Sequence, residues 1–200
     1  MKQQVAAIHG GTSFDTHEDY INFIKTRELT LEKLKHRYDW RSTLGEDLGD
    51  EYEVLLPKMP NGTNVRYEEW RIWLERCIPF FQDNVILIGH SLGGIFLAKY
   101  LSENDVPKTI RATILVAAPF DSVLTVESLN DFHLPGSLAR FATQGGALYM
   151  IHSKDDPIVP FTDMEKYWRA LPGATVIALE DRKHFNEEHF PELVELIRAL

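Results

Sequence analysis

One serine in this chain stands where serine can act as a nucleophile. Ser91 is the centre of a Gly-x-Ser-x-Gly motif that lies between the apolar run 85–88 and the helix-forming segment 95–101. A strand, a tight turn and a helix in that order form a nucleophile elbow, which lifts the serine hydroxyl clear of the backbone. Gly89 and Gly93 fit this interpretation, because a Cβ at either position would crowd the strand against the helix. The bare motif is weak, so its placement between a strand and a helix is what favours catalysis over an ordinary glycine turn.

A serine nucleophile needs a base to take its proton and a carboxylate to orient that base. His184 follows the last predicted strand, Asp155 and Asp156 follow the strand before it, and Asp121 follows the one before that. Functional groups of an open parallel sheet gather where strands end at their carboxyl edge, so these side chains should emerge near Ser91. We expect His184 to act as general base and then acid, with one of these carboxylates holding its imidazole in the productive tautomer.

The remaining histidines are weaker candidates for this role. His189 lies at or near the start of the last predicted helix, where a solvated side chain is expected. We expect His90, inside the serine motif, to point away from the reacting face, and His152 to be packed at the end of its strand. No set of His, Asp and Glu residues has the spacing of a metal site.

A glycine-rich loop follows the apolar run 5–8 and can supply backbone donors. Small residues directly after a strand let N–H groups face a ligand without side chains in the way. We expect the N–H of Leu92, the residue after the serine, to stabilise a developing oxyanion together with that of Gly11 or Thr12. The sequence leaves open which of these two is the second donor.

Six short apolar runs alternate with helical patterns and predict an α/β fold, with a mainly parallel sheet of about six strands flanked by helices. The 200 residues, 44% of them hydrophobic, show no internal repeat and no evident linker, which predicts a single domain over 1–200. The runs are 5–8, 53–56, 85–88, 110–117, 147–152 and 175–179.

The segment between the first two strands holds more helix than one crossover needs. Helical patterns run from 16 to 27, from 30 to 38 and from 40 to 48, and Gly49 stands where the third helix should end. The segment is inserted at the carboxyl end of a strand, which is the edge where the elbow also opens. We therefore expect residues 15–39 to form a small lid over the site.

A longer helical pattern follows the second strand. Trp70, Trp73, Leu74 and Cys77 recur at helical spacing and predict a buried face, with both tryptophans as core anchors. Asn64 stands before this pattern, where a side-chain cap is expected.

Composition disfavours several classes of function. The net charge is −9, from 30 acidic against 21 basic residues, and without a Lys/Arg-rich block nucleic acid is disfavoured as a partner. The single cysteine, Cys77, rules out an internal disulfide and suits a reducing compartment. The first apolar run is too short for a signal peptide, and no run approaches the ~20 residues that span a bilayer, so we expect a cytoplasmic protein. The glycine loops that bind nucleotide phosphates are missing.

The motifs resemble those of the α/β-hydrolase superfamily and, more narrowly, of the small serine hydrolases related to retinoblastoma-binding protein 9. The chain order serine, aspartate, histidine is the order of that superfamily. The likeness rests on His-Gly-Gly at 9–11, Gly-His-Ser-Leu-Gly-Gly at 89–94, Asp-Pro-Ile-Val-Pro at 156–160 and His-Phe at 184–185.

This resemblance implies a compact α/β-hydrolase fold with a triad of Ser91, Asp156 and His184, and it favours Asp156 over Asp155 and Asp121. It implies a serine hydrolase that cleaves small carboxylic esters through an acyl-serine intermediate, without a metal or organic cofactor. The partner would be a small acyl substrate. A thioesterase or amidase would use the same triad, and a protein-interaction module with a vestigial site is a further alternative. The oligomeric state stays open.

Overall fold

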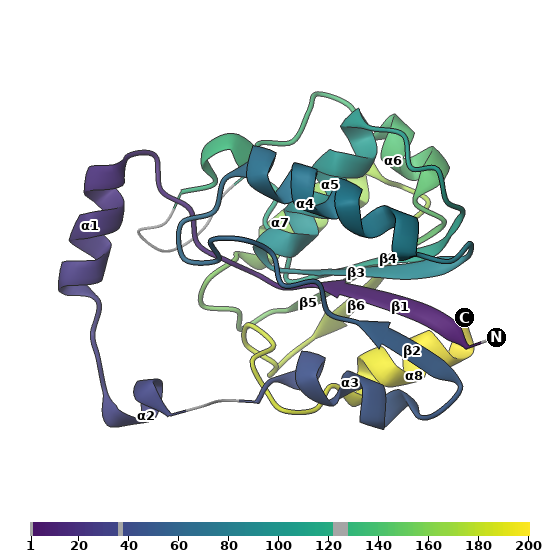
Figure 1. Cartoon of the computed structure of the whole chain (residues 1–200), viewed down its shortest axis with the longest axis horizontal. Helices are drawn as coiled ribbons and strands as arrows, with labels where there is room; N and C mark the ends of the chain where they lie inside the picture. The colour runs from purple at the N-terminus through teal and green to yellow at the C-terminus, as the bar shows by residue number, and fades with distance from the viewer. Residues whose placement is uncertain (1, 36–37, 122–127) are drawn as a thin grey trace.

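Parallel strands form the centre of the molecule (Figure 1). The computed structural model describes residues 2–35, 38–121 and 128–200. Within these ranges six strands lie in the order β2-β1-β3-β4-β5-β6, and every neighbouring pair is parallel. The prediction of a parallel α/β sheet is confirmed. The strands are β1 (Gln3–Ile8), β2 (Tyr52–Leu55), β3 (Val85–His90), β4 (Ile110–Val116), β5 (Ala147–Ser153) and β6 (Thr175–Leu179).

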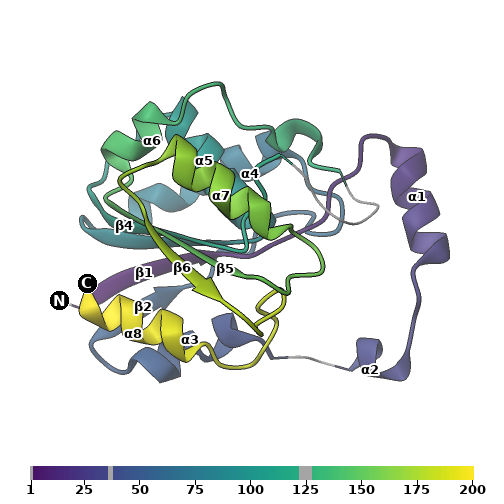
Figure 2. The ribbon, with the colours of Figure 1, turned by 180° about the vertical axis from the view of Figure 1, so that it is seen from behind.

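Helices cover both faces of this sheet. Figures 1 and 2 show α4, α5, α6 and α7 on one face, and α3 and α8 on the other. α3 ends at Gly49, whose φ is 90°, as the sequence predicts. In the described part of the chain no helix is long and apolar enough to cross a membrane. The helices are α1 (His17–Thr26), α2 (Leu31–Leu34), α3 (Trp40–Leu48), α4 (Tyr67–Cys77), α5 (Leu92–Glu103), α6 (Ala139–Gln144), α7 (Phe161–Ala170) and α8 (Pro191–Ala199), with short 3₁₀ turns at Ile78–Phe80 and Asn130–Phe132.

Alternate residues of the central strand enter two separate cores. In β3, Val85 and Leu87 pack in the cluster that contains α4 and α5, whereas Ile86 and Ile88 pack in the cluster that contains α3 and α8. Successive side chains of a strand point to opposite faces, and here both faces are covered. An unbroken apolar run is what such a strand requires, and this places the following residue, Ser91, at the carboxyl edge of the sheet.

The helix after β2 is capped from a distant part of the chain. The Tyr67 N–H, at the start of α4, donates to Asp131 Oδ2 at 3.0 Å. The expected Asn64 cap is wrong, because a carboxylate 64 residues further along the chain takes that position. Trp70 is fully buried, as predicted, but Trp73 is 39% exposed and does not anchor the core.

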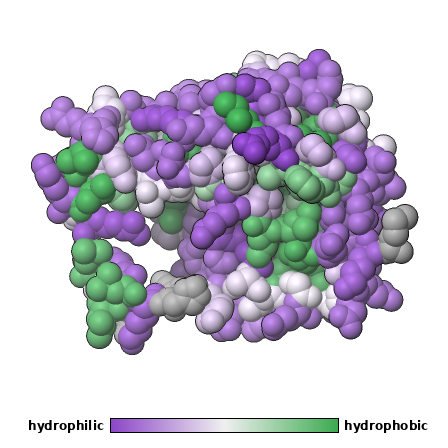
Figure 3. Space-filling model, in the orientation of Figure 1, coloured by the Kyte–Doolittle hydropathy of each residue, from purple (hydrophilic) through white to green (hydrophobic). Residues whose placement is uncertain are grey.

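Residues 15–39 are called the arm, and its helices α1 and α2 stand apart from the two helical layers (Figures 1 and 2). α1 buries no residue, and α2 spans only four residues. It is shorter than the helix expected from 30 to 38, of which residues 36 and 37 lie outside the described ranges. Leu29, Leu31 and Leu34 are 70%, 72% and 70% exposed. Figure 3 shows open space between the arm and the body of the molecule.

Candidate active site

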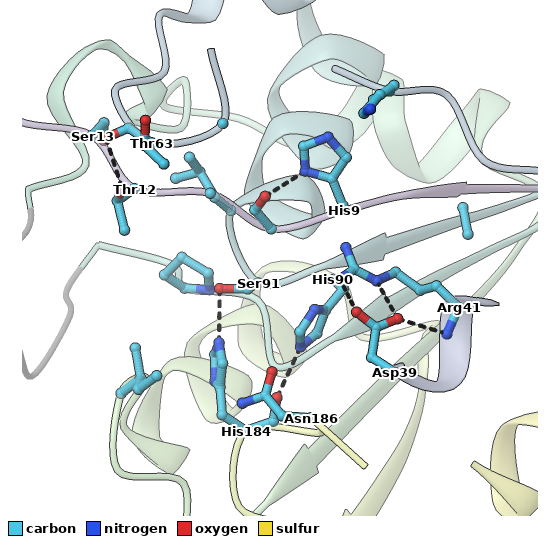
Figure 4. Close-up of a pocket in the computed structure, with 18 of the residues that line it drawn as sticks. His9, Thr12, Ser13, Asp39, Arg41, Thr63, His90, Ser91, His184 and Asn186 are labelled. Carbon is cyan, nitrogen blue, oxygen red and sulfur yellow. Dashed lines mark hydrogen bonds and ion pairs between the residues drawn. The ribbon is translucent and has the colours of Figure 1, made fainter. Parts of the chain in front are cut away.

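Ser91 stands between β3 and α5 in a strained backbone conformation (Figure 4). Its φ of 54° and ψ of −124° lie outside the regions that most residues adopt. A Cβ on Gly89 would lie 2.4 Å from the Gly93 carbonyl oxygen. One on Gly93 would lie 2.6 Å from the carbonyl oxygens of Ile8 and His9. The elbow therefore requires glycine at both positions.

The structure brings Ser91, His184 and Asp156 into one line of hydrogen bonds. His184 Nε2 lies 2.9 Å from Ser91 Oγ, as the dashed line in Figure 4 shows. His184 Nδ1 lies 2.8 Å from Asp156 Oδ2. An ionised carboxylate can only accept, so Nδ1 carries the proton and donates it to Asp156. Nε2 is then the nitrogen that can accept the serine proton.

The Asp156 carboxylate is buried and well supplied with donors. Its side chain has no exposed surface, and its Oδ1 accepts the N–H groups of Ile158 and Val159 at 2.8 and 3.0 Å. His152 lies 3.6 Å from Oδ2, but its Nε2–H donates to the Val159 carbonyl at 3.0 Å. Burial lowers the pKa of His152, which keeps that ring neutral. The two backbone bonds stabilise a carboxylate at this position.

The alternative acids and the alternative histidine are held elsewhere. Asp155 Oδ1 accepts from the Ser153 hydroxyl and from the Lys183 N–H. Asp121 forms an ion pair with Lys166. His189 is exposed and pairs with Asp47 at 3.0 Å. Within the described residues, none of the three is bonded to the serine hydroxyl or to the imidazole beside it.

The loop that presents His184 is strained on both sides of this residue. Lys183 and Phe185 have φ values of 47° and 55°, in the left-handed region that non-glycine residues seldom adopt. The Lys183 N–H donates to Asp155 Oδ1 at 2.9 Å, and the Phe185 N–H donates to the Arg182 carbonyl at 2.9 Å. Asp155 thus serves the site indirectly, because it holds the turn before the histidine.

Two side chains from other elements hold the carbonyl groups of this loop. The Trp40 Nε1–H donates to the Phe185 carbonyl at 3.0 Å. The His90 Nε2–H donates to the His184 carbonyl at 2.9 Å. Trp40 is the first residue of α3, and its backbone N–H donates to the Glu187 carbonyl at 2.8 Å. The strained loop is therefore held from α3 and from the end of β3 at once.

His90 lies beside His184 and lines the pocket in front of Ser91. The centroids of the two histidine rings are 5.1 Å apart. The expectation that His90 points away from the reacting face is wrong, because its bond to the His184 carbonyl turns it toward the loop (Figure 4). Burial lowers its pKa well below the usual range, so the ring is neutral. With Nε2 protonated, Nδ1 is an acceptor, and it has no hydrogen-bond partner among the described residues.

Backbone donors that could serve an oxyanion come from two segments. Leu92 begins α5, so its N–H has no acceptor within the helix. The loop after β1 passes close to Ser91, because a Cβ on Gly10 would lie only 3.0 Å from Ser91 Cβ. In that loop the Thr12 N–H donates to a carbonyl of the facing loop at 3.1 Å. The Gly11 N–H has no backbone acceptor in the part of the chain that the structure describes.

These groups open into a pocket of about 720 Å³. Ser91 and His184 line it together with the loop after β1, the start of α3 and the loop after β2. Figure 4 shows Thr12 toward one end and Arg41 with Asp39 toward the other. A volume of this size suits a small molecule. Across residues 2–35, 38–121 and 128–200, no group of three or more His, Cys, Asp and Glu residues could hold a metal ion.

The sequence does not reveal that α3 helps to build this site. Asp39 is an N-cap signal, and its side chain does accept the Arg41 N–H at 3.0 Å. That signal identifies where a helix begins, but it says nothing of what the helix touches. The bond from Trp40 to Phe185 joins residues that are 145 positions apart.

Comparisons with known proteins point to the same chemistry. The family pattern described as "Serine hydrolase" matches residues 34–197. YdeN of Bacillus subtilis (strain 168) is 31% identical over 143 residues, 70% of this chain and 74% of that protein. The serine hydrolase RBBP9 of Rattus norvegicus is 26% identical over 152 residues, 74% of this chain and 78% of that protein. The crystal structure of the ydeN gene product from B. subtilis matches with a TM-score of 0.72 at 20% identity, covering 99% of this chain and 98% of that one. The chain therefore belongs to the serine hydrolase family, and it is an enzyme with the α/β-hydrolase fold that its motifs predict.

Proposed function

We propose that this serine hydrolase cleaves small carboxylic esters through an acyl intermediate on Ser91. One observation carries the proposal: an unbroken line of hydrogen bonds runs from Ser91 Oγ through His184 to Asp156, at 2.9 and 2.8 Å. A free hydroxyl is a poor nucleophile. Here it has a base within hydrogen-bond distance, and that base has an orienting carboxylate.

In the first half-reaction, Ser91 Oγ attacks the carbonyl carbon of the ester while His184 Nε2 takes the hydroxyl proton. The Nδ1–H of the imidazolium stays hydrogen-bonded to Asp156, and the negative charge of Asp156 stabilises the imidazolium. The tetrahedral intermediate then collapses. Its bond to the alcohol oxygen breaks, His184 Nε2 protonates that oxygen, and the acyl group stays on Ser91.

We assign the developing oxyanion to the backbone N–H groups of Leu92 and Gly11. The Leu92 N–H is available because it lies in the first turn of α5. Of the two candidates for the second donor we choose Gly11, because the Thr12 N–H already has an acceptor. Loss of one such donor costs about 10² to 10³ in kcat.

Water completes the cycle in the second half-reaction. His184 Nε2 accepts a proton from water as the water oxygen attacks the acyl carbon. Collapse breaks the bond to Ser91 Oγ, which takes back the proton from Nε2. The products are one carboxylic acid and one alcohol, with one water added across the ester bond.

The arm would control access to this pocket. Arg27, the residue after α1, lines the pocket, whereas no residue of α1 itself does. The buried Phe14 ring contacts Tyr20 and Phe23 of α1, at 5.7 and 5.0 Å between centroids. Replacing residues 15–39 with a short linker should change the preference for acyl-chain length. An unchanged preference would rule out this role.

Covalent labelling by a fluorophosphonate probe tests the proposed function. The wild type should gain one adduct by intact mass, and Ser91→Ala and His184→Ala should gain none. Ser42→Ala is the matched control, because Ser42 also lines the pocket but its hydroxyl donates to the Asp39 carbonyl at 2.6 Å.

A substrate panel then separates the competing leaving groups. Among an ester, a thioester and an amide of one acyl chain, the ester should have the highest kcat/KM. A thioesterase would instead favour the thioester, and an amidase the amide. A folded wild type that takes no adduct, with or without the arm, would leave a vestigial site and the protein-interaction alternative.

A further inference from the structure

The pocket in front of Ser91 is positively charged, although the whole chain carries a net charge of −9. Apart from histidines, its charged lining residues are Arg27, Arg41, Lys58 and Asp39. Three cations against one anion reverse the sign of the molecule at this place. A cleft focuses such a field and raises the local concentration of ions of the opposite sign.

The one carboxylate in this set is already occupied. Asp39 Oδ1 accepts the backbone N–H and the Nε–H of Arg41, each at 3.0 Å. Asp39 Oδ2 accepts a further bond from Arg41 Nη2. This two-point contact fixes the guanidinium plane at the start of α3. A cationic substrate group would find no unpaired carboxylate among the described lining residues.

The cations, in contrast, have donors to spare. Arg41 uses Nε and Nη2 on Asp39, and its Nη1 has no acceptor among the described residues, so both Nη1 hydrogens can bond to a ligand. Lys58 is exposed on the loop after β2, and Arg27 is exposed at the end of α1. Neither forms an ion pair with an acidic residue of the described chain. Among the charged lining residues, the groups that can still bond to a ligand are therefore the hydrogen-bond donors of the cations.

His9 and His90, the histidines near Arg41, add no charge of their own to the pocket. Burial lowers the pKa of His9, and the nearby Arg41 charge lowers it further. Burial also lowers the pKa of His90, followed by the charges of His184 and Arg41. His9 Nε2 accepts the N–H of Met59 at 3.0 Å, as a neutral ring does. Arg41 thus faces neutral rings.

We propose that the pocket selects esters that carry a carboxylate, with Arg41 and Lys58 as the residues that recognise it. This inference rests on the hydrolase function proposed above. Figure 4 shows Arg41 beyond His90 from Ser91, so the carboxylate and the scissile carbonyl lie on either side of the His90 ring. A neutral ester of the same shape lacks this contact. The charged ester should gain about fivefold in kcat/KM, because charge pairs at partly exposed sites are modest.

Two matched pairs of esters test this selection. The first pair is p-nitrophenyl hexanoate and p-nitrophenyl monoadipate, of which the monoadipate carries a carboxylate on the acyl side. The butyrate esters of 4-hydroxybenzamide and 4-hydroxybenzoate place it on the alcohol side. The charged member of at least one pair should have the higher kcat/KM at low salt. Added salt should reduce that preference, because it screens exposed charges.

Substitutions identify the cations that are responsible. Lys58→Gln should reduce the preference for the charged ester, mainly through KM. Arg41→Gln with Lys58→Gln should abolish it, because Arg27 and Asp39 then leave the lining without net positive charge. Lys108→Gln removes the same charge from a loop before β4, at the opposite edge of the sheet, and should keep the preference.

The outcomes separate this inference from the proposed function. Equal kcat/KM within both pairs, in a wild type that the fluorophosphonate probe labels at Ser91, would overturn charge selection and leave the hydrolase intact. So would a preference that survives in the double variant of Arg41 and Lys58. Failure to label Ser91 would instead remove the hydrolase function on which the inference rests.

Discussion

The loop that carries His184 and the arm both leave the carboxyl edge of the sheet, and they are held in opposite ways. The loop contains neither helix nor strand, yet its backbone bonds to the side chains of Asp155, His90 and Trp40. The arm contains two helices, and α1 buries no residue. In this molecule, hydrogen bonds to neighbouring elements, and not regular secondary structure, tie a segment to the body.

A single peptide bond separates the arm from α3, which helps to hold the His184 loop. Asp39 ends the arm and lines the pocket, and Trp40 begins α3 and holds the His184 loop. The fixed region and the exposed region therefore meet inside the site. The predictions below test each region in turn.

The largest effect should come from removing the groups that the fixed region presents. Ser91→Ala and His184→Ala should each lower kcat for an ester by about 10⁴ to 10⁶. Asp156→Asn should cost about 10⁴, because the imidazole would then hold the wrong tautomer. Ester hydrolysis with circular dichroism as a folding control measures this. A folded His184→Ala variant within tenfold of wild type would contradict the assignment.

A smaller loss should follow when the loop is loosened and its reacting groups are kept. His90→Leu removes the donor to the His184 carbonyl and should lower kcat by about 10², the cost of an ångström-scale misplacement. His90→Gln retains an N–H that can reach this carbonyl and should recover most of the rate. The measurement is kcat and KM for both variants on one ester. Equal rates for Leu and Gln would show that His90 only fills space.

Acid should destabilise the fixed region. Burial is the first cause that lowers the pKa of His9, His90 and His152. Above pH 6.5 these rings are neutral in both the folded and the unfolded protein. Below pH 6.5 the unfolded chain binds protons at these rings, whereas the folded protein does not until the pH reaches the lower folded pKa. The free energy of unfolding should therefore fall, by up to about 1.4 kcal/mol per pH unit for each ring, until the folded pKa is reached.

Urea unfolding at pH 7.5 and pH 5.5 measures this loss. His90→Gln should weaken the pH dependence by the contribution of one ring. A protein that is equally stable at both pH values would show that these histidines are protonated in the folded state.

The smallest effect belongs to the arm. Leu29→Ala and Leu34→Ala should change the free energy of unfolding by no more than about 0.5 kcal/mol, because both side chains are exposed. Leu193→Ala makes the same change in the fully buried core under α8 and should cost about 2 to 5 kcal/mol. Urea unfolding measures all three. A loss above 1 kcal/mol at Leu34 would mean that the arm packs against a surface in solution.

The sheet and the central line of the site are legible in the sequence for local reasons. A strand that is buried on both faces must be apolar throughout, as β3 is. The elbow around Ser91 can be recognised in the sequence because its turn has no room for a Cβ at Gly89 or Gly93, and both positions must be glycine. Asp156 and His184 follow from the rule that loops gather at the carboxyl edge, together with the family pattern that chose Asp156 over its neighbour.

The rest of the site depends on contacts that no local pattern records. Asp131 caps α4 in place of Asn64, and Trp40 holds a loop 145 residues away. The orientation of His90 is set by a carbonyl of that same loop. Each case replaces a local preference with a partner that only the folded chain brings near, as tertiary contacts commonly do.

The bond from Trp40 to the His184 loop also has an optical consequence. Of the four tryptophans, Trp73 and Trp168 are 39% and 55% exposed, whereas Trp40 and Trp70 are buried. Acrylamide quenches the emission of the exposed pair first and leaves the light of the buried pair. The Trp40 indole gives part of that light, and its N–H is bonded to the very turn that presents the imidazole. The emission of Trp40 should therefore report whether the loop that carries His184 is in its native position, without an attached dye.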